Sequence, residues 1–224
     1  MKKKYHIYQM NLLILNIVSI LLFIIVIILT IVINKKLFIE SITIKNTFAF
    51  ILIFLLYTIL HELLHALSYV IHGAKYKNIT YGCALEKGVL YCLCKQNISK
   101  KNILISLIYP FTFIGVITYI IALTLNLKTL LLLSIFNISG SAGDLIMFIF
   151  IIRLKNIEYS EFDDEISFGI YTKEDMTKHK PIGLKYVKEE EKLKIEDKTK
   201  IKISRPSIPI LIILLLLGIL DLAL

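Results

Sequence analysis

Residues 61–65 read His-Glu-Leu-Leu-His, a spacing of side chains that can bind a metal ion and activate water. On an α-helix, His61 and His65 are one turn apart and project from the same face, so both imidazoles can bind one zinc ion. Glu62 lies beside them, where its carboxylate can take a proton from a metal-bound water. The pattern therefore predicts a hydrolytic zinc site with His61 and His65 as ligands and Glu62 as the catalytic base.

Asp144 is the predicted third ligand, because a catalytic zinc ion needs three protein ligands and one open position. The residues that follow the motif, 66–72, do not have the Gly and His spacing of a metzincin continuation. Asp144 is the only acidic residue besides Glu62 deep in an apolar run, where a carboxylate requires a cation or a metal. Small residues at 140–143 would let its helix approach the HELLH helix closely. The alternative is that Asp144 pairs with water or a neighbouring polar group.

Long apolar runs must position these side chains. Hydrophobic residues make up 57% of the 224-residue chain and the mean hydropathy is +0.76, which excludes an ordinary soluble domain. We expect membrane spans at about 12–33, 47–70, 103–125 and 130–152, and a last run at 207–224 that crosses the membrane or is embedded in it. The predicted fold class is an all-α polytopic membrane protein with four to five transmembrane helices.

Two smaller features are expected outside the spans. Residues 79–85 and 89–94, joined by a turn with Gly88, predict a membrane-proximal β-hairpin. Cys92 and Cys94 share one face of the second strand, where they either pack against a neighbour or act as extra metal ligands.

The remaining polar sequence suggests a division into three parts. Residues 1–152 form the metalloprotease core, 153–206 a charged cytoplasmic segment, and 207–224 a C-terminal membrane helix. The middle segment mixes acidic and basic residues, so we expect a small, partly ordered appendage there.

The net charge of +9 reflects membrane topology in this interpretation. Lys and Arg fall between the apolar runs and form no single basic face, so nucleic acid is not expected as a partner. With a cytoplasmic N-terminus, the inner segments carry 22 Lys and Arg residues and the outer loops 4. The positive-inside rule therefore predicts a multi-pass protein of the cell membrane with its N-terminus in the cytoplasm.

Several motifs together resemble a known family. The HELLH helix, followed by an intramembrane aspartate, is similar to the site-2 protease class of zinc metalloproteases. The motifs at 61–66, 91–92, 109–111 and 141–144 more closely resemble the DUF3267 family of zincin-like bacterial membrane peptidases. This resemblance covers roughly residues 50–172. It implies a Zn²⁺ cofactor, a membrane-protein or peptide substrate, and a bacterial source.

The predicted function is hydrolysis of peptide bonds in or near transmembrane segments of membrane proteins. Tyr57, Tyr69 and Tyr109 are the tyrosines that could stabilise the oxyanion, or they could serve packing alone. A metal transporter or sensor is one alternative, although transport needs no base beside an open zinc position. A non-catalytic scaffold is the other, and the intact HExxH motif argues against it.

Overall fold

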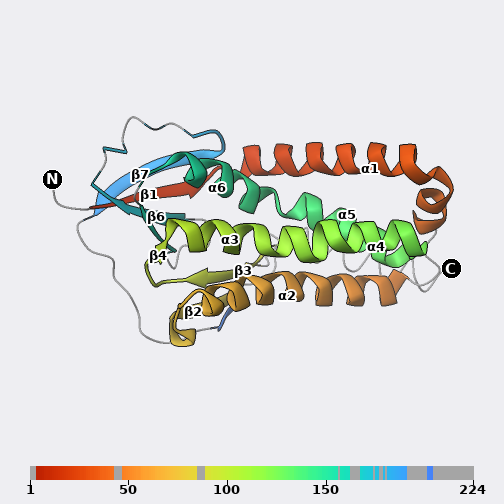
Figure 1. Cartoon of the computed structure of the whole chain (residues 1–224), viewed down its shortest axis with the longest axis horizontal. Helices are drawn as coiled ribbons and strands as arrows, with labels where there is room; N and C mark the ends of the chain where they lie inside the picture. Colours follow the sequence, from red (N-terminus) through yellow and green to blue (C-terminus); the bar gives the residue numbers. More distant parts are fainter. Residues whose placement is uncertain are drawn as a thin grey trace.

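The computed structural model of the chain describes residues 4–42, 47–84, 89–155, 157–161, 167–173, 175–176, 179, 181–190 and 201–203. Its helices lie side by side along the long axis of the molecule, and its strands gather toward one end of them (Figure 1). The helical elements are α1 (Leu12–Ile42), α2 (Thr47–Ile71), η1 (Tyr76–Asn78), α3 (Lys100–Pro110), η2 (Phe111–Ile117), α4 (Thr118–Leu125), α5 (Lys128–Gly140) and α6 (Ala142–Arg153). The strands are β1 (Lys4–Met10), β2 (Ile79–Ala84), β3 (Val89–Cys94), β4 (Ile98–Ser99), β5 (Glu158–Glu161), β6 (Ser167–Thr172), β7 (Leu184–Glu190) and β8 (Ile201–Ile203).

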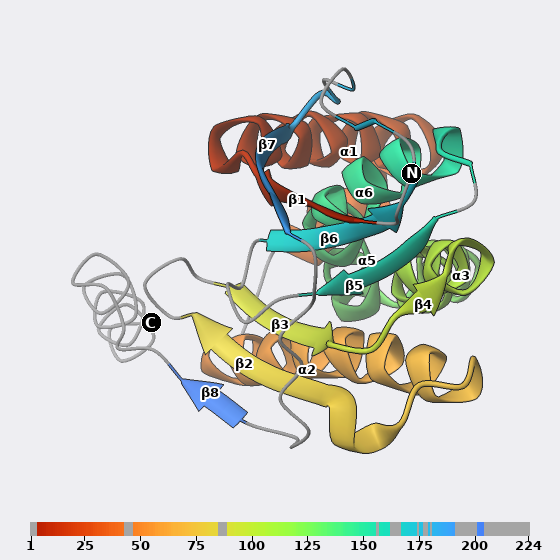
Figure 2. The same cartoon turned by 90° about the vertical axis from the view of Figure 1, so that its left-hand side faces the viewer.

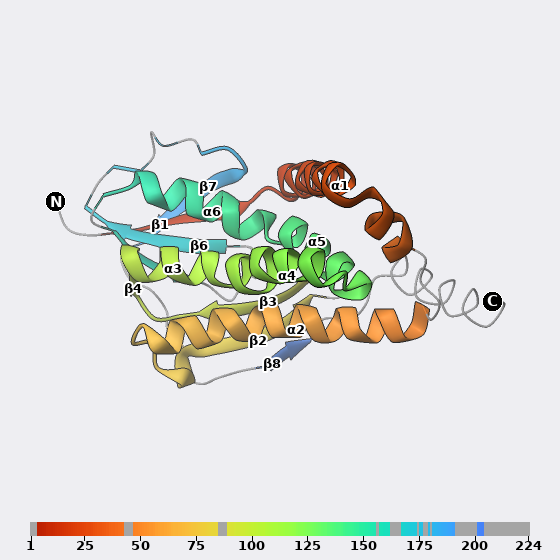
Figure 3. The ribbon, with the colours of Figure 1, turned by 45° about the vertical axis from the view of Figure 1, so that its right-hand side comes forward.

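Three helical segments are long and apolar enough to cross a bilayer, and they overlap the first three expected spans. They are Leu12–Ser41, Thr47–Ile71 and Lys100–Leu125. The first expected span ends next to a break in α1, which Figure 3 shows. At this break Asn34 leaves the helical conformation, and its side chain accepts a hydrogen bond from the Leu37 amide. The expected run at 207–224 lies outside the described residues.

The fourth expected span, 130–152, is a bent pair of helices. α5 and α6 meet at 44° and together are long and apolar enough to cross the membrane. The bend follows Gly140 at Ser141, where the hydroxyl of Ser141 donates to the Asn137 carbonyl. Ser139 O accepts a hydrogen bond of 2.9 Å from the Ser19 hydroxyl of α1. A polar side chain from a neighbouring helix thus compensates the interrupted backbone.

The expectation of an all-α fold is wrong, because a five-stranded antiparallel sheet lies at one end of the helices (Figure 2). Its strand order is β4-β5-β6-β1-β7. The N-terminal strand β1 pairs with β6 on one edge and with β7 on the other. Strands β5, β6 and β7 of the charged segment are therefore part of the folded core. The expectation of a partly ordered appendage is wrong for these strands.

Burial explains why β1 forms a strand although lysines precede it. Tyr5, His6, Ile7 and Tyr8 are all buried. The Tyr8 ring packs against Phe150 of α6 and Phe168 of β6, so β1 connects the sheet to the helices. The sheet and the nearby ends of α2, α3 and α6 share one hydrophobic core.

The expected hairpin is present as β2 and β3, whose paired residues run from Ile79 opposite Cys94 to Ala84 opposite Val89. These strands and β8 form a second sheet of order β3-β2-β8. The hairpin lies along α2 (Figures 1 and 3). This places β3 at the sheet edge beside the HELLH helix.

Candidate active site

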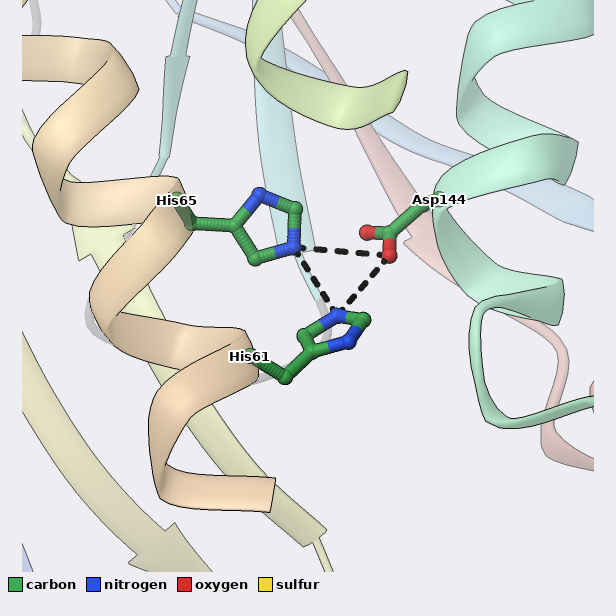
Figure 4. Close-up of side chains that lie close together, drawn as sticks. All are labelled: His61, His65 and Asp144. Carbon is green, nitrogen blue, oxygen red and sulfur yellow. Dashed lines mark hydrogen bonds and ion pairs between the residues drawn. The ribbon is translucent and has the colours of Figure 1, made fainter. Parts of the chain in front are cut away.

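The structure brings His61, His65 and Asp144 together, although Asp144 is about 80 residues from the histidines in sequence. The two imidazoles come from α2 and the carboxylate from α6, and the three side chains point toward one another (Figure 4). His61 Nε2 lies 3.2 Å from His65 Nε2 and 3.3 Å from Asp144 Oδ2. His65 Nε2 lies 3.4 Å from the same oxygen. Within the described part of the chain, this is the one group of three or more His, Cys, Asp or Glu residues with the spacing of metal ligands.

These distances match the edges of a small tetrahedral site. Zinc bonds to imidazole nitrogen and carboxylate oxygen are about 2.0–2.2 Å long, so neighbouring ligand atoms in a tetrahedron lie about 3.3–3.6 Å apart. The donor set of two imidazoles and one carboxylate is typical of catalytic zinc sites with one open position. The three residues therefore fit a catalytic zinc ion.

The second nitrogen of each imidazole contacts a hydrogen-bond acceptor. His61 Nδ1 lies 2.8 Å from Asn137 Oδ1, and His65 Nδ1 lies 2.9 Å from the Ser106 carbonyl. Since both partners are oxygen acceptors, both Nδ1 atoms carry the proton and donate it. The Nε2 lone pairs are then left to face the metal position, the arrangement in which such partners fix ligand orientation.

Asn137 is held in turn by the irregular helix that faces it. Its Nδ2 donates to the Pro110 carbonyl, where α3 passes into the π-helix η2. Gly115 of η2 lies so close that a Cβ there would be 3.2 Å from Asn137 Nδ2. A π-helix at this position agrees with the frequent occurrence of such turns at functional sites. Asn137 was not among the predicted site residues; its signal in the sequence was an amide inside an apolar run, seven residues before Asp144.

Asp144 reaches the histidines because α6 begins only two residues before it. The positive end of the helix dipole at this first turn favours a carboxylate. The side chains of His61, His65 and Asp144 are 13%, 7% and 15% exposed, so the cluster is shielded but can still be reached from a cavity.

Glu62 lies on the wall of that cavity, which has a volume of about 220 Å³. The cavity is also lined by the three clustered residues, by 90–93 of β3, and by Met10 and Phe168 of the five-stranded sheet. The backbone amide of Cys92 donates a hydrogen bond to the Glu62 carboxylate. The edge of β3 therefore turns toward the predicted base.

A second cavity of about 250 Å³ is also lined by His61 and Glu62. Its walls include three aromatic side chains, Phe54 and Tyr57 of α2 and Phe136 of α5. His61 and Glu62 are therefore shared by the walls of both cavities.

The remaining candidates contribute less to the cluster. Cys92 and Cys94 are buried thiols, and neither belongs to the group with metal-ligand spacing. The Tyr57 hydroxyl contacts Thr118 and the Ile114 carbonyl. Tyr69 stacks on His65 and lines the first cavity, whereas Tyr109 packs against Phe113.

Comparison with known families identifies this region. A family model described as "Putative zincin peptidase" matches residues 54–159. This is the DUF3267 family, and residues 54–159 are similar to it. The DUF3267 region includes the HELLH motif, the hairpin, Asn137 and Asp144, and it ends before β6, so the expected resemblance to residue 172 extends beyond the match. No curated protein and no solved structure matches the chain.

The DUF3267 match supports assignment to the zincin metallopeptidases at the level of the family. The three grouped side chains have the spacing of residues that could hold a metal ion. The roles predicted for His61, Glu62, His65 and Asp144 stay predictions.

Proposed function

We propose that the protein is a zinc-dependent metallopeptidase that hydrolyses peptide bonds in or beside transmembrane segments of membrane proteins. The observation that carries this proposal is that Asp144 lies beside His61 and His65, with Glu62 on the wall of the same cavity. His61, Glu62 and His65 belong to α2, a helix that is apolar enough to span a bilayer. The similarity to the site-2 protease class is part of the proposal and rests on the intramembrane aspartate.

The chemistry divides among few side chains. Zn²⁺ bound by His61, His65 and Asp144 would lower the pKa of a bound water and polarise the scissile carbonyl. Asn137 and the Ser106 carbonyl keep the two imidazoles oriented through their Nδ1 protons.

Glu62 acts as the proton carrier. Its carboxylate takes a proton from the attacking water and later delivers it to the leaving amine. The Cys92 amide fixes the carboxylate on the cavity wall. The general base therefore stands beside the clustered ligands without being one of them.

The substrate binds as an extended strand along β3. β3 is the edge strand of its sheet among the described residues, and residues 90–93 line the cavity beside the cluster. Strand addition would present an unfolded peptide bond, which a transmembrane helix would otherwise shield. The second cavity, which contains Phe54, Tyr57 and Phe136, would accept an apolar side chain of the substrate next to the cut.

Depth in the membrane supports a substrate that is itself a membrane protein. His61 lies 14 residues from the start of α2 and 10 from its end. At about 1.5 Å per residue, the cluster is roughly 15 Å from the nearer end. The sheet end is cytoplasmic in this proposal, because the Lys and Arg distribution places it inside.

Purified protein in detergent tests the function directly. We expect one zinc ion per chain and cleavage of a single-span substrate, both measured on the same preparation, with Glu62→Gln as the inactive control. Zinc binding with no cleavage of a panel of membrane substrates would contradict the peptidase and favour a metal transporter or sensor.

Topology requires its own measurement. In a background that lacks the native cysteines, a single Cys at Lys77 should resist a membrane-impermeant reagent in intact cells, and one at Lys128 should react. The reverse pattern would contradict the cytoplasmic placement of the sheet end.

A further inference from the structure

A separate cavity lies between α1 and α6, away from the metal cluster. Its volume is about 510 Å³, which is in the range of small-molecule sites. Val18 and Leu22 of α1 form one wall, and Leu145 and Ile149 of α6 form the other. None of the residues around the metal cluster lines it.

One end of this cavity is cationic. Arg153, at the end of α6, and His179 line it where the helices approach the five-stranded sheet. Among the described residues, no acidic side chain pairs with Arg153. The Lys100 ammonium donates to the carbonyls of Ile152 and Leu154, so two of the carbonyls at the end of α6 that would repel an anion are already paired with a cation. The guanidinium is therefore left to bind a ligand oxygen.

The dimensions match one leaflet of a bilayer. Leu22 is ten residues from the start of α1, a rise of roughly 15 Å. The hydrocarbon core of a membrane is about 30 Å thick, so the apolar walls extend to about half its depth. The cationic end lies at the sheet end of both helices, where headgroups would be.

We propose that this cavity is a binding site for an anionic phospholipid. One acyl chain would lie between Val18, Leu22 and Ile149, and the headgroup phosphate would accept hydrogen bonds from Arg153 and the His179 imidazole. A lipid fits better than a protein segment, because the walls are apolar throughout and the polar groups gather at one end only. The bound lipid would brace α1 against the helix that carries Asp144.

Native mass spectrometry of the full chain in detergent tests this proposal, with an anionic and a zwitterionic phospholipid of identical acyl chains. We expect one tightly bound lipid, with at least about tenfold preference for the anionic form, the effect of one charge-assisted contact. Arg153→Gln should remove this preference. Lys101→Gln is the matched control, because Lys101 is an exposed cation at the same end of the bundle that does not line the cavity.

Filling the cavity tests its apolar part. Ile149→Trp should weaken binding of both lipids about tenfold or more, and Leu22→Phe should weaken it from the opposite wall. Ile152→Trp is the control on the same helix, because Ile149 and Ile152 are 51% and 49% exposed but only Ile149 lines the cavity.

Three results would overturn the site. They are equal binding of the two lipids by the unaltered protein, unchanged lipid binding in both filled variants, or full competition by inorganic phosphate alone, which would show that the acyl chain has no part. A change from dimer to monomer in Ile149→Trp would instead assign the cavity to a second copy of the chain and also contradict the proposal.

Discussion

The two halves of the candidate metal site are built differently. α2 supplies His61, Glu62 and His65 from five consecutive residues of one continuous helix. α5 and α6 supply Asp144 only because the chain bends by 44° between them. Helical periodicity alone places the side chains of the first half on one face of α2. The position of Asp144 depends instead on the break between α5 and α6, where the Ser139 carbonyl accepts a hydrogen bond from Ser19 of α1.

This difference also extends to the groups that orient the ligands. Asn137 of the bent segment holds His61, so the second half positions a residue of the first. His65 is held by a backbone carbonyl of α3, which no side-chain substitution removes directly. Variants in each half should therefore separate chemistry, metal binding and ligand orientation.

The largest expected effect belongs to the α2 half. Glu62→Gln should lower kcat by about 10³-fold while zinc content stays at one per chain, because the amide cannot carry the proton but the ligands remain. Cleavage rates and metal analysis on the same sample measure both. Loss of zinc together with retained cleavage would assign Glu62 a ligand role.

Asp144→Asn tests the α6 half. Zinc affinity should fall by more than about 100-fold, since loss of partners outside the ligand shell already costs about 10–100-fold and this change removes a ligand. His65→Ala is the matched change on α2 and should lose the metal to a similar extent. Competition with a zinc chelator gives the affinities, and unchanged thermal unfolding of the metal-free proteins shows that each bundle folds. Normal affinity in Asp144→Asn would require a different third ligand.

Asn137→Leu should weaken zinc binding by about 10–100-fold, because His61 loses the acceptor that fixes its ring. Ser106→Ala provides the contrast: it removes a hydroxyl but leaves the carbonyl that holds His65, so zinc affinity should change only a few-fold. Equal effects of the two changes in chelator competition would remove the distinction between side-chain and backbone support.

The smallest expected effect lies one contact farther away. The Cβ of Gly115→Ala would stand 3.1 Å from Ile138 Cγ1 and 3.2 Å from Asn137 Nδ2, so Asn137 must shift and zinc affinity should fall a few-fold. Gly140→Ala has no atom within 4 Å of its new Cβ and should leave zinc affinity unchanged. A larger loss in Gly140→Ala than in Gly115→Ala would contradict this support of His61.

Local patterns account for what could be predicted. The HELLH spacing, the hairpin strands and three apolar helices are properties of neighbouring residues. The five-stranded sheet was missed because β1, at Lys4–Met10, pairs with strands more than 150 residues away. The lysines at the start of the sequence, including Lys4, and the charges of β7 also resemble membrane-flanking sequence. Asn137 was missed because its partner lies on another helix.

The central place of β1 determines when the cavity beside the metal cluster can form during synthesis. Met10 and Phe168 line that cavity. The second edge of β1 is paired only after β7, which begins at Leu184, has been synthesised. At translation rates of about 5–20 residues per second, β7 leaves the ribosome on the order of ten seconds or more after β1. The nascent chain thus carries its HELLH helix before the walls of its cavity exist, and a chain truncated before β7 would contain the metal ligands without the completed sheet.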